Sequence, residues 1–247
     1  MSKPVFSLIA PSVRSAYYQQ VYDSIARDAK VPFEFIFVGN VEPLKKIADN
    51  FHYINTNVKP AQCVEIAARN ATGDFLIPIA DDITFSDNFL NTILKNINSN
   101  PEKVFSFNLL IDGKINDNFL YWHIRKSRDK LVGASGVFER KMWNDLGGVD
   151  SRFIYINYDK DIMFRYMETK DLVIIPECFI NENRYIHKSS RRASSVLDAI
   201  CERDLFNSLW VNDDKKVSSK RLKKVNSFDD KDILIKSQGR NIESIWE

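Results

Sequence analysis

The hydrophobic and polar positions of the first third of the chain alternate between two periods. Four short apolar runs are typical of buried strands: VFSLIA (5–10), FEFIFVG (33–39), HYIN (52–55) and FLIPIA (75–80). Between them, apolar residues recur at helical spacing from Ser15 to Ala29 and again from Pro60 to Thr72. Strands separated by helices of this length predict a parallel, doubly wound sheet.

The middle of the chain follows a different pattern. The apolar segments KVFSFNLLI and FLYWHIRK flank Asp112 and Gly113, which is a hairpin signal, so we expect antiparallel strands to join the sheet here. A short helix is expected from Glu139 to Leu146, and another from about Asp159 to Glu168, before the strand LVII (172–175). The expected fold class is α/β, with a mostly parallel sheet flanked by helices.

The C-terminal part of the chain is predicted to be one helix followed by a polar segment. The helix, residues 193–210, would bury one side, formed by Val196, Leu197, Ile200, Cys201, Leu205 and Leu209. Residues 211–224 hold six Lys or Arg against two Asp, which is typical of a linker or a mobile tail. We therefore predict a main domain over residues 1–190 and a helical extension with a basic tail over residues 191–247.

Composition is typical of a soluble globular protein. Of the 247 residues, 44% are hydrophobic and 28% are charged, and the formal net charge of +2 gives no reason to expect a nucleic acid partner. No run approaches the roughly 18 apolar residues of a membrane span, and no signal-like segment opens the chain. Cys63, Cys178 and Cys201 are scattered and odd in number, so we expect reduced thiols in a cytoplasmic protein.

Two adjacent carboxylates follow one of the predicted strands. In GDFLIPIADDITFSDNFL (73–90), the apolar run ends at Asp81 and Asp82. Ligands of doubly wound sheets bind beyond the carboxyl ends of the strands, where Pro11 and Ser12 are also expected. Paired carboxylates at such an edge suit Mg²⁺ or Mn²⁺, and the ion in turn binds a diphosphate. The alternative is a solvated turn that also caps the next helix.

Three blocks of the sequence carry a combination of motifs. They are SLIAPSVR (7–14), ATGDFLIPIADDI (71–83) and GASGVFERKMWNDLGGVDSRFIYINYDKDIMFR (133–165). In order and spacing they resemble the inverting GT-A glycosyltransferases of family 2. There, the first strand ends in Pro-Ser/Thr, A-x-G-D precedes an apolar strand and D-x-D, and a GG-x-D-x-x-F turn precedes E-D-x-D-x-x-x-R. The resemblance implies the GT-A fold, a Rossmann-like, mostly parallel sheet flanked by helices.

The resemblance also implies a nucleotide-diphosphate sugar as donor, UDP by default, and Mn²⁺ or Mg²⁺ as cofactor. Asp82 takes the last position of D-x-D, which is the family's metal-contacting acid, and Asp81 takes the middle position, where it assists or binds through water. Ala80 and Gly39 stand where the family has acids that contact the ribose or the base. The donor-binding residues that the resemblance implies are Pro11, Ser12, Arg14, Asn40 and Asp81.

The third block implies the catalytic residue. Asp159 keeps the Asp of the family's E-D pair, while Tyr158 replaces the Glu. In the family this Asp is the general base that removes the acceptor hydroxyl's proton opposite the departing diphosphate; the alternative for Asp159 is compensation of the helix dipole. Asp161 and Arg165, four apart on one helix, are expected to form a supporting ion pair. His187 stands where the family often has a histidine near the metal, and a metal-ligand role and a structural role both stay open for it.

We therefore expect a metal-dependent inverting glycosyltransferase, as in polysaccharide biosynthesis, whose acceptor is a glycan, a lipid-linked glycan or a protein. The basic segment 211–224 suggests peripheral contact with an anionic membrane, and a solvated tail is the alternative.

Two other functions stay open. A nucleotidyltransferase of related α/β fold also uses paired acids, but the stretch APSVRSAYY lacks the glycine of its phosphate-binding loop. A binding module that has lost catalysis is favoured by Ala80, Gly39 and Tyr158 and disfavoured by Asp82 and Asp159.

Overall fold

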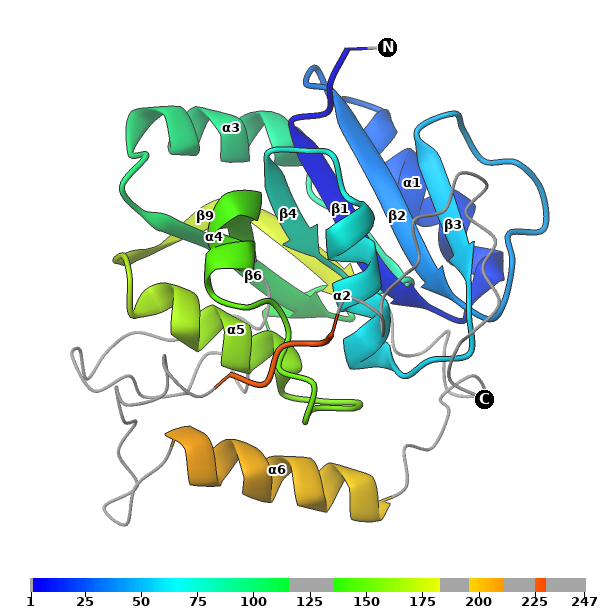
Figure 1. The fold of residues 1–247 in the computed structure, drawn as a ribbon. Helices are drawn as coiled ribbons and strands as arrows, with labels where there is room; N and C mark the ends of the chain where they lie inside the picture. The colour runs from blue at the N-terminus through cyan, green and yellow to red at the C-terminus, as the bar shows by residue number, and fades with distance from the viewer. Residues whose placement is uncertain (1, 116–135, 183–195, 211–224, 230–247) are drawn as a thin grey trace.

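The computed structural model describes residues 2–115, 136–182, 196–210 and 225–229 (Figure 1). Its strands are β1 (Phe6–Ser12), β2 (Phe33–Gly39), β3 (Phe51–Asn55), β4 (Phe75–Pro78), β5 (Ile83–Phe85), β6 (Val104–Ile111), β7 (Lys114–Ile115), β8 (Gly136–Glu139) and β9 (Leu172–Glu182). Its helices are the 3₁₀ helix η1 (Ser15–Tyr17), α1 (Tyr18–Ala26), α2 (Pro60–Asn70), α3 (Phe89–Ser99), α4 (Arg140–Asp145), α5 (Tyr158–Met167) and α6 (Val196–Trp210).

The strands form one sheet in the order β3-β2-β1-β4-β8-β6-β9-β5, with β7 paired to β6. The four strands β1 to β4 run parallel, as the alternating pattern of the first third predicts. β8 is antiparallel to both β4 and β6, β9 runs parallel to β6, and β5 is antiparallel to β9. The predicted fold class, an α/β fold with a mostly parallel sheet, is confirmed.

Several element boundaries differ from the sequence prediction. The helix expected from Ser15 begins as η1 and continues as α1 only to Ala26. β4 ends at Pro78, two residues before the predicted end, and the unpredicted strand β5 pairs with the end of β9. Asp112 and Gly113 form the expected turn with left-handed φ values of 50° and 77°, joining β6 to β7. The predicted partner segment FLYWHIRK lies outside the described residues.

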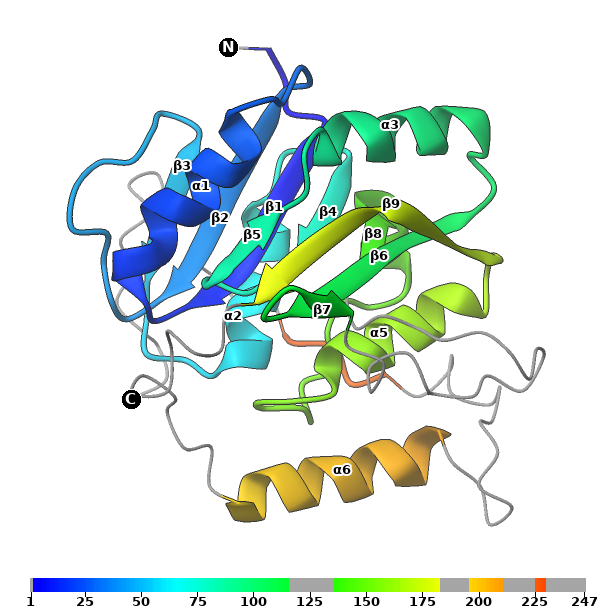
Figure 2. The ribbon, with the colours of Figure 1, turned by 180° about the vertical axis from the view of Figure 1, so that it is seen from behind.

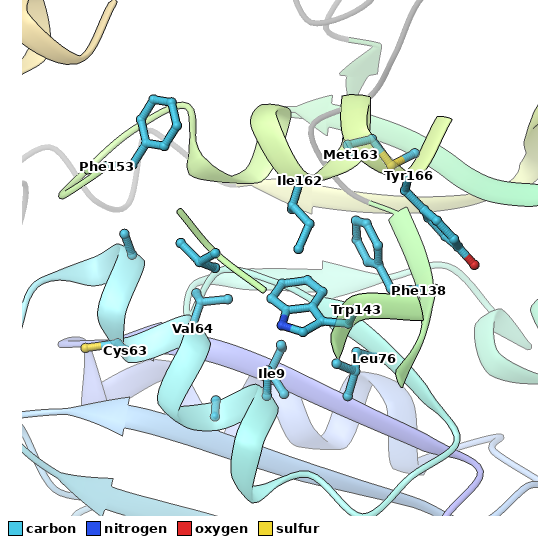
Figure 3. Packing of buried hydrophobic residues seen from close by; sticks show 14 of the residues in the cluster. Ile9, Cys63, Val64, Leu76, Phe138, Trp143, Phe153, Ile162, Met163 and Tyr166 are labelled. Carbon is cyan, nitrogen blue, oxygen red and sulfur yellow. The ribbon is translucent and has the colours of Figure 1, made fainter. Parts of the chain in front are cut away.

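Two hydrophobic clusters cover the two faces of the sheet, because successive strand residues point in opposite directions. Ile9 of β1 joins the cluster under α2, α4 and α5, whereas its neighbour Leu8 joins the cluster under α1 and α3. Figure 1 shows α2, α4 and α5 in front of the sheet, and Figure 2 shows α1 and α3 from behind. Trp143 of α4 lies at the centre of the first cluster, between Leu76 and Ile162 (Figure 3).

The C-terminal helix α6 packs against α5. The ring of Phe164 on α5 lies 5.7 Å from that of Phe206 and 5.2 Å from that of Trp210. The most deeply buried residues of α6 are Glu202, Phe206 and Trp210. Of the side expected to be buried, Leu205 and Leu209 are partly buried against the core, whereas Cys201 is exposed. The division of the chain at residue 190 stays a prediction.

Candidate functional site

The end of β1 is fastened to the end of β4 by Asp81. The side chain of Asp81 is buried, and its Oδ2 accepts hydrogen bonds from the backbone N–H groups of Val13 (2.6 Å) and Arg14 (2.8 Å). Its Oδ1 accepts from the guanidinium of Arg14. Because β1 and β4 are parallel neighbours, their carboxyl ends meet at one edge, and Asp81 joins them there.

Asp82 shares the same cation. Its Oδ2 lies 3.2 Å from Nη1 of Arg14, and the Asp82 side chain is 6% exposed. Burial alone lowers the pKa of Arg14, but the facing charges of Asp81, Asp82 and Glu182 outweigh that effect, so the pKa of Arg14 is raised overall. Arg14 is therefore the counter-ion of an acidic group at the carboxyl edge of the sheet.

Five buried side-chain polar atoms of the described residues lack a hydrogen-bond partner. Four of them lie at the end of β1 or just after β1, β2 or β3, and the fifth, that of Tyr53, lies within β3. The five are Ser12 Oγ, Arg14 Nε, Asn40 Oδ1, Tyr53 Oη and Thr56 Oγ1. Two of these residues have a polar group near by: Ser12 lies near the Tyr18 hydroxyl, and Tyr53 lies near the backbone of Val41. The atoms of Arg14, Asn40 and Thr56 are thus the clearest cases. Buried polar atoms are nearly always paired in native proteins, so this group indicates a site for a polar ligand.

Gly39, at the end of β2, stands where the family that the sequence resembles has an acidic residue. A Cβ atom on Gly39 would lie 1.7 Å from the backbone oxygen of Ser12 on the neighbouring strand, so no side chain fits there. The Gly39 carbonyl accepts from the N–H of Thr56 (2.7 Å), and Asn40 Nδ2 donates to Asn57 (3.0 Å). Asn40 is therefore the first side chain after β2 that can face a ligand.

Asp159 lies in the first turn of α5, which begins after Asn157, a residue with a left-handed φ of 62°. Loss of water around the half-buried carboxylate raises the pKa of Asp159, against the opposing charge of Lys160. The preceding loop contacts the start of α2, because the Ile154 carbonyl accepts from the N–H of Ala61 (3.0 Å). Since α2 follows β3, α5 starts at the same edge of the sheet as Thr56.

The turn between α4 and α5 is held by Glu65 of α2, which sequence reasoning missed. The buried Glu65 accepts from the N–H of Val149 (2.9 Å), from Trp143 Nε1 (3.1 Å) and from Arg69 Nε (2.8 Å). Burial raises the pKa of Glu65 despite these donors. A Cβ on Gly148 would lie 2.4 Å from Glu65 Oε2, so the second glycine of the turn makes room for this carboxylate. No sequence signal distinguishes Glu65 from an exposed helical acid.

The expected ion pair on α5 is confirmed. Arg165 Nε lies 3.0 Å from Asp161 Oδ2, and both side chains are fully buried. Arg165 also donates to the carbonyls of Leu146 and Gly148, each at 2.6 Å. This pair therefore supports α5 and the turn before it.

Of the predicted metal ligands, only Asp82 lies within the described residues, and His187 lies outside them. Those residues contain no cluster of three or more His, Cys, Asp or Glu that could hold a metal ion. The Asp81 carboxylate already accepts two backbone N–H groups and the guanidinium of Arg14, so it is a poor candidate for a direct ligand. Asp82 offers a hard carboxylate oxygen that suits Mg²⁺ or Mn²⁺. A metal ion there would share this carboxylate with the guanidinium of Arg14.

A pocket of about 430 Å³ lies away from this edge, where β4 begins. Its lining includes Asp74, Phe75, Glu139, Arg140 and Lys170. The charged groups there already have partners, since Lys170 pairs with Glu139 and Arg140 Nε donates to the Gly73 carbonyl (2.8 Å). This pocket is therefore separate from the candidate site.

None of the described helices is both long enough and apolar enough to cross a membrane. The basic segment 211–224 lies outside the described residues, so its predicted contact with a membrane is untested.

The fold is similar to that of solved GT-A glycosyltransferases. S. aureus TarS 1-349 in complex with UDP-GlcNAc matches with a TM-score of 0.56 and 15% identity, over 76% of this chain and 62% of that chain. GalNAc-T7 with UDP, GalNAc and Mn²⁺ matches with a TM-score of 0.65 and 11% identity, over 84% of this chain and 49% of that chain. This chain thus spans less than two thirds of either neighbour. No family model and no curated protein sequence matches the chain. The protein is therefore an α/β protein with the GT-A fold.

Proposed function

We propose that this protein is a glycosyltransferase that moves a sugar from a nucleotide-diphosphate sugar to a hydroxyl group of an acceptor. The observation that carries the proposal is the group of unpaired buried polar atoms at the ends of β1 to β3, beside Asp81 and Asp82. Such a group fits the base and ribose of a nucleotide, and the acidic edge next to it fits a metal-bound diphosphate.

The donor is proposed to bind along this edge. Asn40 and Thr56 are placed to hydrogen-bond a base or ribose, next to Pro11 and Ser12 at the end of β1. Arg14 faces the diphosphate, held in place by Asp81. UDP is the proposed nucleotide, which the complexes of both neighbours support, since they contain UDP or UDP-GlcNAc.

Asp82 is proposed to hold Mn²⁺ or Mg²⁺, with His187 as a second protein ligand. The structure of GalNAc-T7 contains Mn²⁺ together with UDP, which supports a divalent ion for this fold. When bound, the ion would stabilise the charge of the departing diphosphate. Asp81 contributes indirectly, because it fixes the position of Arg14.

Asp159 is proposed to be the general base of an inverting reaction. A base with a raised pKa is closer to the working pH and therefore accepts a proton more effectively. The burial that raises the pKa of Asp159 suits this role. In a direct displacement, the acceptor oxygen loses its proton to Asp159 as it attacks the anomeric carbon opposite the diphosphate. The proposed acceptors are a glycan, a lipid-linked glycan or a protein.

One observation favours a second function, a nucleotide-sugar-binding module without catalysis. Arg14 already pairs with both Asp81 and Asp82, and a cation that competes with Arg14 for these carboxylates would bind more weakly. Such a module would bind UDP without transferring a sugar.

A screen of nucleotide sugars separates these functions. The full chain is incubated with Mn²⁺ and UDP-, GDP- or CMP-sugars, with and without candidate glycan acceptors, and nucleotide release is measured. Release that requires Mn²⁺ and is lost in Asp82→Asn supports the transferase. The matched control is Asp74→Asn, because Asp74 is exposed and lies at the opposite end of β4. UDP binding without release from any donor would favour the binding module.

Contact with a membrane is a separate proposal, based on the six Lys or Arg of residues 211–224. Each basic residue near an anionic surface contributes about 1 kcal/mol of attraction. Sedimentation with phosphatidylserine vesicles should fall when these residues are deleted. Unchanged sedimentation would contradict the proposal.

A further inference from the structure

A buried carboxylate on α6 binds the loop that leads into α5. Glu202 is 3% exposed. Its Oε1 accepts from the backbone N–H of Tyr155 (2.8 Å), and its Oε2 accepts from the backbone N–H of Ile156 (2.7 Å). One carboxylate thus fixes two successive peptide groups with charge-assisted hydrogen bonds, which are the stronger kind.

This loop determines where α5 begins. Asn157 follows Ile156 directly and takes a left-handed conformation, and its carbonyl accepts the helical hydrogen bond from Asp161 (2.8 Å). Asp159 is two residues further along. A rotation of the peptide groups at Tyr155 and Ile156 would therefore change the direction in which α5 starts and move the Asp159 carboxylate.

A second contact of α6 is made on the helix itself. Trp210 Nε1 donates to Asp161 Oδ1 at 2.7 Å, and the other oxygen of Asp161 pairs with Arg165. Glu202 and Trp210 are eight residues apart, which is about 12 Å along a helix. Hence α6 holds α5 at two separate points, one before Asp159 and one just after it.

Neither contact is needed for hydrophobic packing alone. Phe206, between Glu202 and Trp210 on the same face, already packs against Phe164. An apolar side chain at position 202 could extend that packing, and a buried charge is costly unless it is well paired. The two polar contacts fix the orientation of α5 relative to α6, because hydrogen bonds require a particular distance and angle.

We propose that α6 is a positioning element for Asp159, with Glu202 and Trp210 as positioning residues. This inference rests on the proposed role of Asp159 as general base. Displacing a reacting group by about 1 Å can cost about 10²-fold in rate, so a shift of the loop should lower the turnover number. Donor binding should not change, because the polar atoms of Ser12, Asn40 and Thr56 belong to other elements.

The test compares Glu202→Gln and Trp210→Phe with two control variants in the full chain. Glu202→Gln replaces one accepting oxygen by an NH₂ group that faces a backbone N–H, and Trp210→Phe removes the indole donor and part of the ring volume while keeping an aromatic side chain. Ser208→Ala is the control on α6, since its exposed hydroxyl donates to the Leu205 carbonyl of the same helix. Phe89→Leu is the control for stability, because Phe89 is buried in the cluster on the opposite face.

Three quantities are measured for each variant: melting temperature, Kd for UDP with Mn²⁺, and kcat for the donor and acceptor identified by the nucleotide-sugar screen. We expect Glu202→Gln to lower kcat by at least about 10-fold and Trp210→Phe by less, with Kd for UDP unchanged within about twofold. Phe89→Leu should lower the melting temperature without this fall in kcat. Hydrogen exchange at the amides of Tyr155 and Ile156 should accelerate in Glu202→Gln even where no transfer is measured.

Asp159→Asn distinguishes the two proposals. If Asp159→Asn keeps full transfer, the proposed base is wrong. If Asp159→Asn loses transfer while folded Glu202→Gln and Trp210→Phe keep the wild-type kcat, or lose no more than Phe89→Leu, the positioning role is wrong. Should Glu202→Gln not fold, Trp210→Phe decides alone, and an unchanged kcat there overturns the proposal. Unchanged amide exchange at Tyr155 and Ile156 in folded Glu202→Gln would also overturn it.

Discussion

The carboxyl edge of β1 to β3 and the unit formed by α4, α5 and α6 both bury polar side chains, but they pair them differently. At the edge, Arg14, Asn40 and Thr56 each bury a polar atom without a partner. In the helical unit, Asp161 and Arg165 are fully buried and make hydrogen bonds to each other, to Trp210 and to two carbonyls. Unpaired buried groups cost stability, so the edge is suited to a ligand, and the helical unit is suited to the proposed role of holding Asp159 in place.

Asp159 links the two regions, because it lies on α5 of the helical unit and α5 starts at the carboxyl edge of the sheet. Its replacement should have the largest effect. Asp159→Asn keeps the shape of the side chain but cannot accept a proton, so transfer should fall by about 10²–10⁴-fold. Affinity for UDP should stay the same, because the donor is bound at the other side of the reacting carbon. Turnover and UDP affinity measured on one preparation check this. Full turnover of the folded variant would remove Asp159 from the mechanism.

The raised pKa of Asp159 adds a prediction about pH. A carboxyl group whose pKa is raised in the folded state is stabilising in its protonated form, so folding stability falls as pH rises from the ordinary pKa toward the raised one. At neutral pH, Asp159→Asn should therefore melt at the same temperature as the wild type or higher. A helix-dipole role predicts a lower melting temperature instead. For a base, transfer should increase with pH through the raised pKa.

Breaking the buried ion pair of Asp161 and Arg165 in the helical unit should mainly affect stability. Asp161→Asn leaves the Arg165 charge buried without its counter-ion, which should lower the free energy of unfolding by about 3–5 kcal/mol. Urea unfolding measures this change. The control is Lys141→Met, which breaks the exposed pair of Lys141 and Asp145 and should have little effect. Equal effects in the two variants would show that the buried pair has no special role.

The two neighbouring acids should differ in kind. Asp82→Asn should weaken Mn²⁺-dependent binding of UDP by at least about 10–100-fold, a range seen for groups that support a metal indirectly, with little loss of stability. Asp81→Asn should lower the melting temperature, because Asp81 Oδ2 accepts the N–H groups of Val13 and Arg14. Calorimetry of UDP binding with and without Mn²⁺ and thermal unfolding distinguish the two variants. Unchanged affinity in Asp82→Asn would place the metal elsewhere.

The smallest effect is expected at Thr56, one of the unpaired polar groups at the carboxyl edge of the sheet. Thr56→Val removes a buried hydroxyl that has no hydrogen-bond partner among the described residues. Stability should therefore stay the same or rise, while UDP affinity should fall by about 0.5–1.5 kcal/mol, the worth of one hydrogen bond. Calorimetry and thermal unfolding measure both. Loss of stability with unchanged UDP affinity would mean that Thr56 has a structural partner and not a ligand.

Much of the fold can be predicted from local patterns in the sequence. The alternation of apolar runs and helical spacing predicted β1 to β4, α2 and the parallel half of the sheet, since each pattern depends on which face of an element meets the core. The turn at Asp112 and Gly113 was equally readable, because few residues adopt positive φ. Strand β5 was missed because three residues, Ile83 to Phe85, are too short for a periodicity and become a strand only beside β9.

The candidate site divides in the same way. Position at the ends of strands was enough to select Asp81 and Asp82, and spacing along α5 was enough to predict the pair of Asp161 with Arg165. Asp159 was selected by the resemblance to family 2, and its role stays a proposal. The partners of these groups depend on contacts between residues far apart in sequence. Arg14 meets Asp81 only because β1 and β4 are neighbours, and the orphaned Thr56 hydroxyl becomes significant only once it is known to be buried.

Helix α6 gives the clearest case of this division. Hydrophobic spacing indicated a helix there with a buried side through Cys201, Leu205 and Leu209. The structure exposes Cys201, buries Leu205 and Leu209 only partly, and buries Glu202, Phe206 and Trp210 most deeply. Burying the Glu202 carboxylate costs free energy because the group loses its water. The hydrogen bonds from two backbone N–H groups of the loop before α5 offset that cost. The chain's pattern could indicate that a helix forms, while its rotation and its role depend on what it meets in space.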